Sequence, residues 1–181
     1  MLPVRCAQWR RGAMTISAER PRRPSAALLR DPACALALGF GAGLAPRAPG
    51  TCGALLGLPL AAALSVLPVP AAVLVLAALG ALGVWCCGRA GRRLGVSDHP
   101  AIVWDEVIGM ALTLLAVPLA WSPYLLGFAL FRLFDIVKPW PIGALDRHVG
   151  GGLGAMLDDV AAGVLAGITL QLVVLAGQRL A

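Results

Sequence analysis

Residues 151–177 read GGLGAMLDDVAAGVLAGITLQLVVLAG, and this stretch decides the class of fold. From residue 160 to residue 178 it carries no charged side chain, a length close to the ~20 residues that cross a bilayer core as a helix. Asp158 and Asp159 stand directly before this run. The stretch therefore predicts a membrane helix at residues 160–178 with a doubled negative charge at its start.

The composition of the whole chain supports the same class of protein. Of its 181 residues, 59% are hydrophobic and only 13% are charged. A soluble domain is about half apolar and about a quarter charged. The length suits one domain, and the balance excludes an ordinary soluble enzyme.

The basic residues are concentrated at the N-terminus. Residues 1–30 contain seven arginines and one acid, Glu19, whereas the rest of the chain has equal numbers of basic and acidic residues, so the whole net charge of +6 lies in this arm. We expect residues 1–30 to form a disordered, Arg-rich cytoplasmic arm near anionic lipid. Residues 31–181 then form a helical membrane domain, and no nucleic-acid partner is expected.

The five cysteines do not predict a zinc site or a disulfide framework. Cys86 and Cys87 are adjacent inside an apolar run, the others are dispersed, and only two histidines are present. Zinc sites need Cys and His at short, regular spacings. We expect these cysteines to be small apolar core residues.

Prolines and charges divide the apolar sequence into helices. The uncharged run between Arg47 and Arg89 is too long for one crossing, and Pro68 and Pro70 interrupt it because proline breaks a helix. Similar reasoning predicts an all-α polytopic membrane protein of about five to six helices, in two hairpins plus a C-terminal span. The expected helices lie near 51–67 and 70–88, near 105–120 and 123–138, and at 160–178, with a shorter one near 31–42.

Two further features of these helices can be read from spacing and charge. Gly163 and Gly167 form a GxxxG pair, which lets a neighbouring helix approach closely. Basic residues follow each expected hairpin, and basic loops face the cytoplasm. These loop residues are Arg89, Arg92, Arg93, Lys138 and Arg147.

Under this topology the acids gather at the same membrane face. One explanation is helix capping, because acids in a first turn are favoured by the helix dipole. The other is a cation site, because unpaired carboxylates near lipid are costly. We favour the cation site, and oxygen ligands without Cys or His suit Mg²⁺ or Mn²⁺. The acids are Asp98, Asp105, Glu106, Asp135, Asp146, Asp158 and Asp159.

Basic residues accompany the acids. Arg132, Asp135 and Lys138 share one face at helical spacing. Simple salt bridging explains this stripe, but so does a site in which Arg and Lys bind phosphate oxygens. The loop APGTCG at residues 48–53 would add backbone N–H donors at a helix N-terminus. A cation-binding or ion-coupled membrane transport protein, or an assembly protein, is the alternative to a phosphate-processing enzyme.

Four motifs in order resemble the phosphatidylglycerophosphatase A family, over about residues 31–178. They are GFGAGLAPRAPGTCGALLGLPL (39–60), DHPAIVWDEVIGM (98–110), FRLFDIVKPWPI (131–142) and DRHVGGGLGAMLDDVAAG (146–163). The resemblance implies an all-helical, multi-pass enzyme of the bacterial inner (cytoplasmic) membrane with its active site facing the cytoplasm. It implies Mg²⁺-dependent removal of the terminal phosphate of a phospholipid substrate, phosphatidylglycerophosphate, to give phosphatidylglycerol.

The resemblance also implies roles for particular residues. Asp146 or His99 is a candidate general acid, and both direct attack by water and a covalent aspartyl-phosphate fit the residue types. The chain departs from the family at Ala45 and Ala54, where serine is common, and at Arg47, which offers a replacement phosphate contact. The expected catalytic residues are Asp105, Glu106, Asp135, Asp146, Asp158 and Asp159; the phosphate-binding residues are Arg132, Lys138, Arg147, Gly50, Thr51 and Gly53; the metal ligands are Asp105, Glu106, Asp158 and Asp159.

Overall fold

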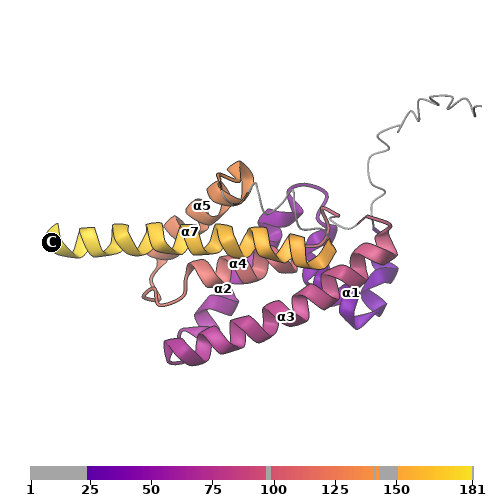
Figure 1. The fold of residues 1–181 in the computed structure, drawn as a ribbon, viewed down its shortest axis with the longest axis horizontal. Coiled ribbons are helices and arrows are strands. Elements are labelled where there is room, and N and C mark those ends of the chain that lie inside the picture. Colours follow the sequence, from indigo (N-terminus) through magenta and orange to yellow (C-terminus); the bar gives the residue numbers. More distant parts are fainter. Residues whose placement is uncertain (1–23, 97–98, 141, 143–150, 181) are drawn as a thin grey trace, which may run out of the picture.

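The computed structural model describes residues 24–96, 99–140, 142 and 151–180. Within these residues every regular element is a helix (Figure 1), which confirms the all-α prediction. Most of the N-terminal arm (residues 1–23) and the predicted site residues Asp146 and Arg147 lie outside the described residues.

The helices follow one another with short connections. The first three elements are short, and the longer helices follow them. In chain order they are η1 (Ala26–Arg30), α1 (Pro32–Ala37), η2 (Gly39–Leu44), α2 (Pro49–Leu64), α3 (Val69–Leu94), α4 (Trp104–Thr113), α5 (Trp121–Val137) and α7 (Gly151–Leu180).

Two of the described helices are long and apolar enough to cross a membrane. They are Val69–Leu94 and Gly152–Arg179, with mean hydropathies of 2.2 and 2.1. The helices α2, α4 and α5 have 16, 10 and 17 residues, fewer than the ~20 that a bilayer core requires. The two long helices suggest membrane association, and the shorter ones pack against them.

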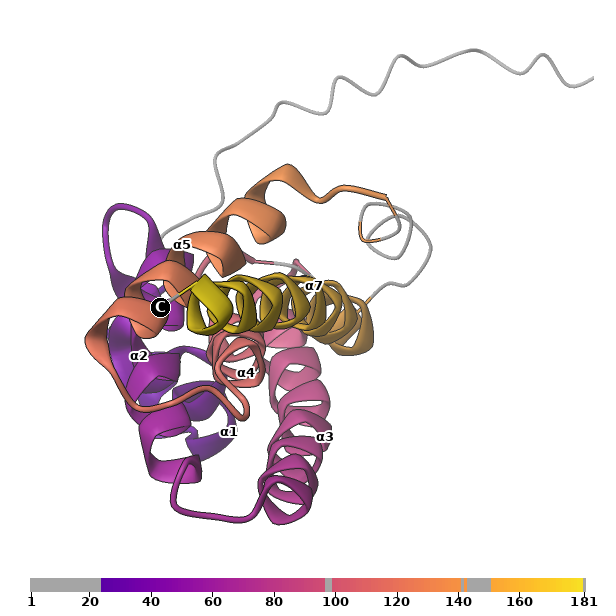
Figure 2. The ribbon, with the colours of Figure 1, turned by 90° about the vertical axis from the view of Figure 1, so that its left-hand side faces the viewer.

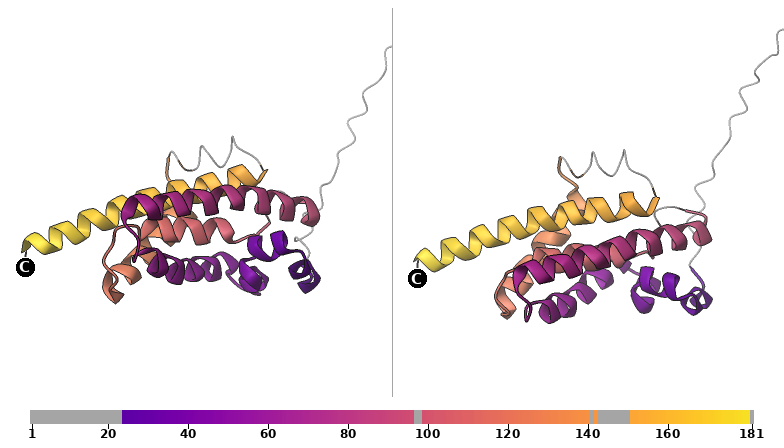
Figure 3. Two further views of the ribbon diagram at one scale, coloured as in Figure 1. Left: turned by 90° about the horizontal axis from the view of Figure 1, so that it is seen from below. Right: turned by 60° about the horizontal axis from the view of Figure 1, so that its bottom comes forward.

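Helix α4 occupies the centre of the fold. It contacts α2, α3, α5 and α7, and Figure 2 shows it between α2 and α3. The first pair of helices therefore forms an open hairpin that holds α4 between its arms. The short helices η1 and α1, which come first in the described chain, lie beside the C-terminal end of α3 (Figure 3).

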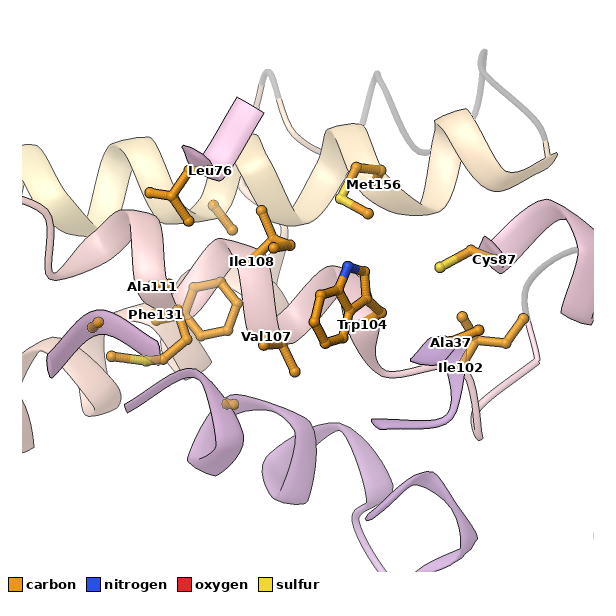
Figure 4. Packing of buried hydrophobic residues seen from close by; sticks show 14 of the residues in the cluster. Ala37, Leu76, Cys87, Ile102, Trp104, Val107, Ile108, Ala111, Phe131 and Met156 are labelled. Carbon is orange, nitrogen blue, oxygen red and sulfur yellow. The ribbon is translucent and has the colours of Figure 1, made fainter. Parts of the chain in front are cut away.

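The core is built around α4 because eight of its ten residues are buried. Removal of apolar side chains from water is the main favourable contribution to the free energy of folding. Figure 4 shows α4 side chains packed with residues of α3, α5 and α7. The labelled residues include Trp104, Val107, Ile108 and Ala111 of α4, with Leu76, Phe131 and Met156 from its neighbours.

Glycines allow α4 and α7 to meet backbone to backbone. A Cβ atom on Gly163 would lie only 3.1 Å from the carbonyl carbon of Gly109. The Thr113 hydroxyl lies 3.0 Å from the carbonyl oxygen of Gly109 and 3.3 Å from that of Gly163, which joins the two helices. A Cβ on Gly167 would lie 3.2 Å from the backbone carbonyl oxygen of Thr113. The close approach predicted from the GxxxG spacing is confirmed.

Helix α7 begins nine residues before the predicted start. It starts at Gly151, so Asp158 and Asp159 lie two turns inside the helix, at 3.6 residues a turn. The expectation that they stand at its mouth was wrong. Glycine is needed near this start because a Cβ on Gly152 would lie 2.6 Å from the Gly88 nitrogen of α3. This packing offsets the low helix propensity of glycine.

Other boundaries also differ from the expected ones. Helix α3 continues to Leu94, six residues further. Helix α4 ends at Thr113 instead of residue 120, since Ala116 adopts a left-handed conformation with φ of 59°. The expected helix near 31–42 divides into α1 and η2, which bends at Phe40 with φ of 55°.

Candidate active site

Three carboxylates from two distant segments form a compact cluster. Asp105, Glu106 and Asp159 each offer an oxygen atom, and these atoms all lie within 4.8 Å of one another. Asp105 and Glu106 occupy the first turn of α4, whereas Asp159 comes from α7. The close contact between α4 and α7 brings them together. We call these three residues the carboxylate cluster.

The start of α4 is held in place by the chain around it. The Val103 N–H donates to the Ala37 carbonyl of α1 at 2.9 Å, and the Ile102 N–H donates to the His99 carbonyl at 2.8 Å. The His99 ring is buried, and its Nδ1 accepts from the Ala101 N–H at 3.1 Å. These bonds fix the turn from which Asp105 and Glu106 project.

The cluster is an unfavourable place for uncompensated negative charge. Asp105 and Asp159 are each 5% exposed. Burial raises the pKa of Asp105, with the Glu106 carboxylate as the next cause, and burial raises the pKa of Glu106 to about 7. Glu106 Oε2 has no hydrogen-bond partner among the described residues.

These observations fit a bound divalent cation. The donor set is all oxygen, which hard cations such as Mg²⁺, Mn²⁺ and Ca²⁺ require. A cation would offset the repulsion between these buried like charges, and the unpartnered oxygen of Glu106 would serve as one of its ligands. The residues present therefore form an acidic cluster suited to a metal ion.

Helix α5 brings basic side chains to the cluster. Arg132 pairs with Asp135 on the same helix, as their spacing predicted. Asp135 also lies against Asp159. Arg132 Nε has no hydrogen-bond partner within the part of the chain that the structure describes.

Asp158 and Asp159 are adjacent but face different partners. Asp159 belongs to the carboxylate cluster, whereas Asp158 pairs with Lys138, which ends α5 in a left-handed conformation with φ of 44°. Both acids are buried. The sequence grouped the two acids as metal ligands, and the structure brings only Asp159 into the three-residue group.

The predicted loop residues reach the site to different degrees. A Cβ on Gly50 would lie 3.3 Å from the Glu106 carboxyl carbon and 3.4 Å from Nη1 of Arg132, so the first turn of α2 lies directly against the site. Gly53 packs against α4, since its Cβ would lie 2.8 Å from the Val103 carbonyl oxygen. The Thr51 N–H donates to the Ala48 carbonyl at 3.0 Å.

Sequence reasoning missed one residue that shapes the cluster. Gly109 lies one turn after Asp105 on α4, and a Cβ there would lie 2.7 Å from the Asp159 carbonyl oxygen. Any larger residue would push α7 and its carboxylate away. Its signal was a glycine within an apolar helix of a protein that already contained a GxxxG pair.

The described residues form an all-helical protein whose two long apolar helices suggest membrane association, and whose acidic cluster is suited to a metal ion. The model of the phosphatidylglycerophosphatase A family matches residues 35–174. The chain belongs to the phosphatidylglycerophosphatase A family. It is therefore an enzyme, a phosphatase, which confirms the resemblance drawn from the four motifs.

Three relatives illustrate the match. Phosphatidylglycerophosphatase A of Escherichia coli is 46% identical over 132 residues, which cover 72% of this chain and 77% of the relative. The protein of the same name from Haemophilus influenzae is 44% identical over 144 residues, 78% of this chain and 88% of the relative. A Bacteroides thetaiotaomicron protein, provisionally named a phosphatidylinositol-3-phosphatase, is 42% identical over 140 residues, 73% and 87% of the two chains. No solved structure matches the chain.

Proposed function

We propose that this phosphatase hydrolyses phosphatidylglycerophosphate to phosphatidylglycerol and phosphate in a Mg²⁺-dependent reaction of phospholipid biosynthesis. The names of two relatives at 44–46% identity support the substrate. The observation that carries the proposal is the carboxylate cluster, which lies against the first turn of α2 at Gly50, where the side chain of Arg132 also approaches. Few other reasons exist to keep three acids together in so apolar a fold.

In this proposal Asp105, Glu106 and Asp159 hold the metal. When bound, Mg²⁺ supplies positive charge that stabilises the transferring phosphoryl group. Asp158 holds Lys138 in position through their ion pair. Asp135 does the same for Arg132, and it also contacts the Asp159 carboxylate.

The remaining residues bind the phosphate. Arg132 and Lys138 donate hydrogen bonds to its oxygens, and charge-assisted bonds of this kind are about twice as strong as neutral ones. The first turn of α2 at Gly50 adds the positive end of a helix dipole. In the net reaction an oxygen of water bonds to phosphorus, the bond from phosphorus to the glycerol oxygen breaks, and a proton from the water ends on that oxygen. Three roles stay predictions from the sequence: Asp146 as a catalytic residue, Arg147 as a phosphate-binding residue, and Asp146 or His99 as the general acid.

We place the enzyme in the bacterial inner membrane with the carboxylate cluster toward the cytoplasm. Helices α3 and α7 cross the bilayer, and α3 ends in Arg92 and Arg93, which basic-residue placement assigns to the cytoplasmic side. Residues 31–181 then form the membrane domain, and η1 (Ala26–Arg30) packs on α1 of this domain.

The test is phosphate release by detergent-purified protein. We expect release from phosphatidylglycerophosphate with Mg²⁺, none with EDTA, and recovery when Mg²⁺ is restored. Phosphatidylinositol 3-phosphate serves as the competing substrate. Activity that survives EDTA would contradict the metal role, and a preference for the inositol lipid would contradict the substrate. Asp159→Asn tests the cluster, and Asp31→Asn is its matched control, because it makes the same substitution at an aspartate outside the cluster.

A further inference from the structure

A second charged feature lies on another side of α3. It is an open cavity of about 810 Å³ between η1, α1 and α3. Cys86 lines this cavity, whereas the adjacent Cys87 is buried on the side of the carboxylate cluster. The proposed reaction uses no residue of this cavity. We call it the arginine cleft. The residues that matter are Arg30, Asp31, Leu82, Trp85, Arg89 and Arg93.

The cleft carries excess positive charge in a fixed arrangement. Asp31 Oδ2 accepts from Arg89 Nη2 at 2.9 Å and pairs with Arg93 Nη2 at 2.8 Å. The Arg89 bond lowers the pKa of Asp31, which keeps this carboxylate ionised. Arg30 adds a third guanidinium, so three positive charges face one negative charge.

The two paired arginines still have donors to offer. A guanidinium has five N–H groups, and the ion pairs with Asp31 engage only some of them. The side chains of Arg89 and Arg93 are 41% and 48% exposed. Asp31 thus holds two guanidinium groups side by side while leaving N–H groups directed to other ligands.

Below the arginines the surface of α3 is apolar. Leu82 and Trp85 are both well exposed, and the Arg89 guanidinium lies 6.0 Å from the centre of the Trp85 ring. Tryptophan favours the interface between lipid and water, with basic residues at headgroup level. The cleft therefore spans the boundary between the apolar and the charged surface of a candidate membrane helix.

We propose that the arginine cleft binds an anionic phospholipid, with its phosphate on Arg30, Arg89 and Arg93 and an acyl chain along Leu82 and Trp85. Charge complementarity selects the anionic headgroup, because a zwitterionic lipid would bring its own cation into the excess positive charge. Free phosphate would leave the apolar half of the cleft unused. This lipid site is separate from the carboxylate cluster and does not depend on the proposed substrate.

Quenching of Trp85 fluorescence tests the proposal directly. The full-length protein is reconstituted in vesicles of phosphatidylcholine that contain increasing fractions of acyl-brominated phosphatidylglycerol or, separately, brominated phosphatidylcholine. The signal of Trp85 is the difference between the wild type and Trp85→Phe. We expect the anionic lipid to quench this signal at low fractions and to saturate, whereas the zwitterionic lipid quenches only in proportion to its fraction.

Arginine variants identify the headgroup contact. Arg30→Gln leaves the Asp31 pairs intact, and we expect it to raise the fraction of anionic lipid needed for half-quenching about fivefold. Arg179→Gln, at the far end of α7, should leave it unchanged. Unchanged phosphatase activity and elution volume would show that both variants fold.

Three results would overturn the lipid site. Equal quenching by both lipids would remove its selectivity. If Arg30→Gln and Arg179→Gln raised the fraction of anionic lipid needed for half-quenching equally, the binding would reflect only the general attraction of a basic protein for anionic lipid. Relief of quenching by inorganic phosphate alone would make the cleft a free-anion site.

Discussion

The carboxylate cluster, on α4 and α7, and the arginine cleft, beside α3, are two charged regions that are built in opposite ways. The cluster gathers buried acids whose positions depend on glycine contacts between α2, α4 and α7. The cleft gathers half-exposed arginines around one acid in an open cavity. Because charges interact more strongly where water is excluded, small changes should matter far more in the cluster than in the cleft.

The strongest test of this difference is removal of one cluster charge. We expect Asp159→Asn, and equally Asp105→Asn, to reduce phosphate release on the order of 10³-fold, since each removes a carboxylate that holds the proposed metal, whose positive charge stabilises the phosphoryl group. The measurement is kcat/KM for phosphatidylglycerophosphate at saturating Mg²⁺. Asparagine has nearly the same shape as aspartate, so the elution profile and helical content should not change.

The corresponding change in the cleft supplies the contrast. If Asp31→Asn reduced activity as much as Asp159→Asn, the two regions would not differ as their burial indicates. If Asp159→Asn kept most of its activity, the cluster would be a structural feature and the catalytic centre would lie elsewhere.

A single methyl group should also distinguish the cluster from the rest of the molecule. Gly50→Ala places a Cβ against the Glu106 carboxylate and Arg132, and we expect a loss of activity of about 10²-fold from misplacement of these groups. Gly177→Ala is the matched control, because a Cβ there meets nothing within 4 Å. The control should keep full activity and gain about 0.5–1 kcal/mol of stability as a helical alanine.

Much of the fold could be predicted from the sequence because its signals are local. Uncharged runs, prolines and the GxxxG pair depend only on neighbouring residues, and they predicted where the helices lie and that a neighbouring helix approaches closely at Gly163; the structure identifies that helix as α4. The start of α7 was missed because the glycines at residues 151, 152 and 154 look like a loop. Only the packing of Gly152 on Gly88 of α3 shows why they lie in a helix.

The sequence predicted that the three carboxylates of the cluster lie near one another, but not which partner each acid faces. Asp105, Glu106 and Asp159 were all expected at one membrane face, and the structure brings them together. Adjacent residues on a helix point about 100° apart, so Asp158 and Asp159 must face different neighbours. Which one faces Lys138 depends on how α7 is rotated against α5, and no local pattern reports this rotation.

The pair Asp158–Lys138 gives a third, smaller test. We expect Asp158→Asn and Lys138→Met each to lower kcat/KM about 10-fold, with the double variant little worse than either, because groups that act through one contact are not additive. The concentration of Mg²⁺ for half-maximal activity should stay unchanged. A rise in that concentration, with a loss as large as that of Asp159→Asn, would make Asp158 a metal ligand as the sequence grouping predicted.

The smallest effect is expected in the cleft. Asp31→Asn removes the carboxylate charge that joins the start of α1 to Arg89 and Arg93 of α3, whose side chains are about half exposed, and ion pairs of exposed side chains contribute little to stability. We expect phosphatase activity within about twofold of the wild type and an unfolding midpoint in detergent lowered by no more than about 2 °C. Because Asp31 also offsets part of the positive charge, binding of anionic lipid should persist or strengthen in this variant. A loss of lipid quenching would instead show that Asp31 is needed to hold the two guanidinium groups in their binding arrangement, so the same variant separates the charge of the cleft from its geometry.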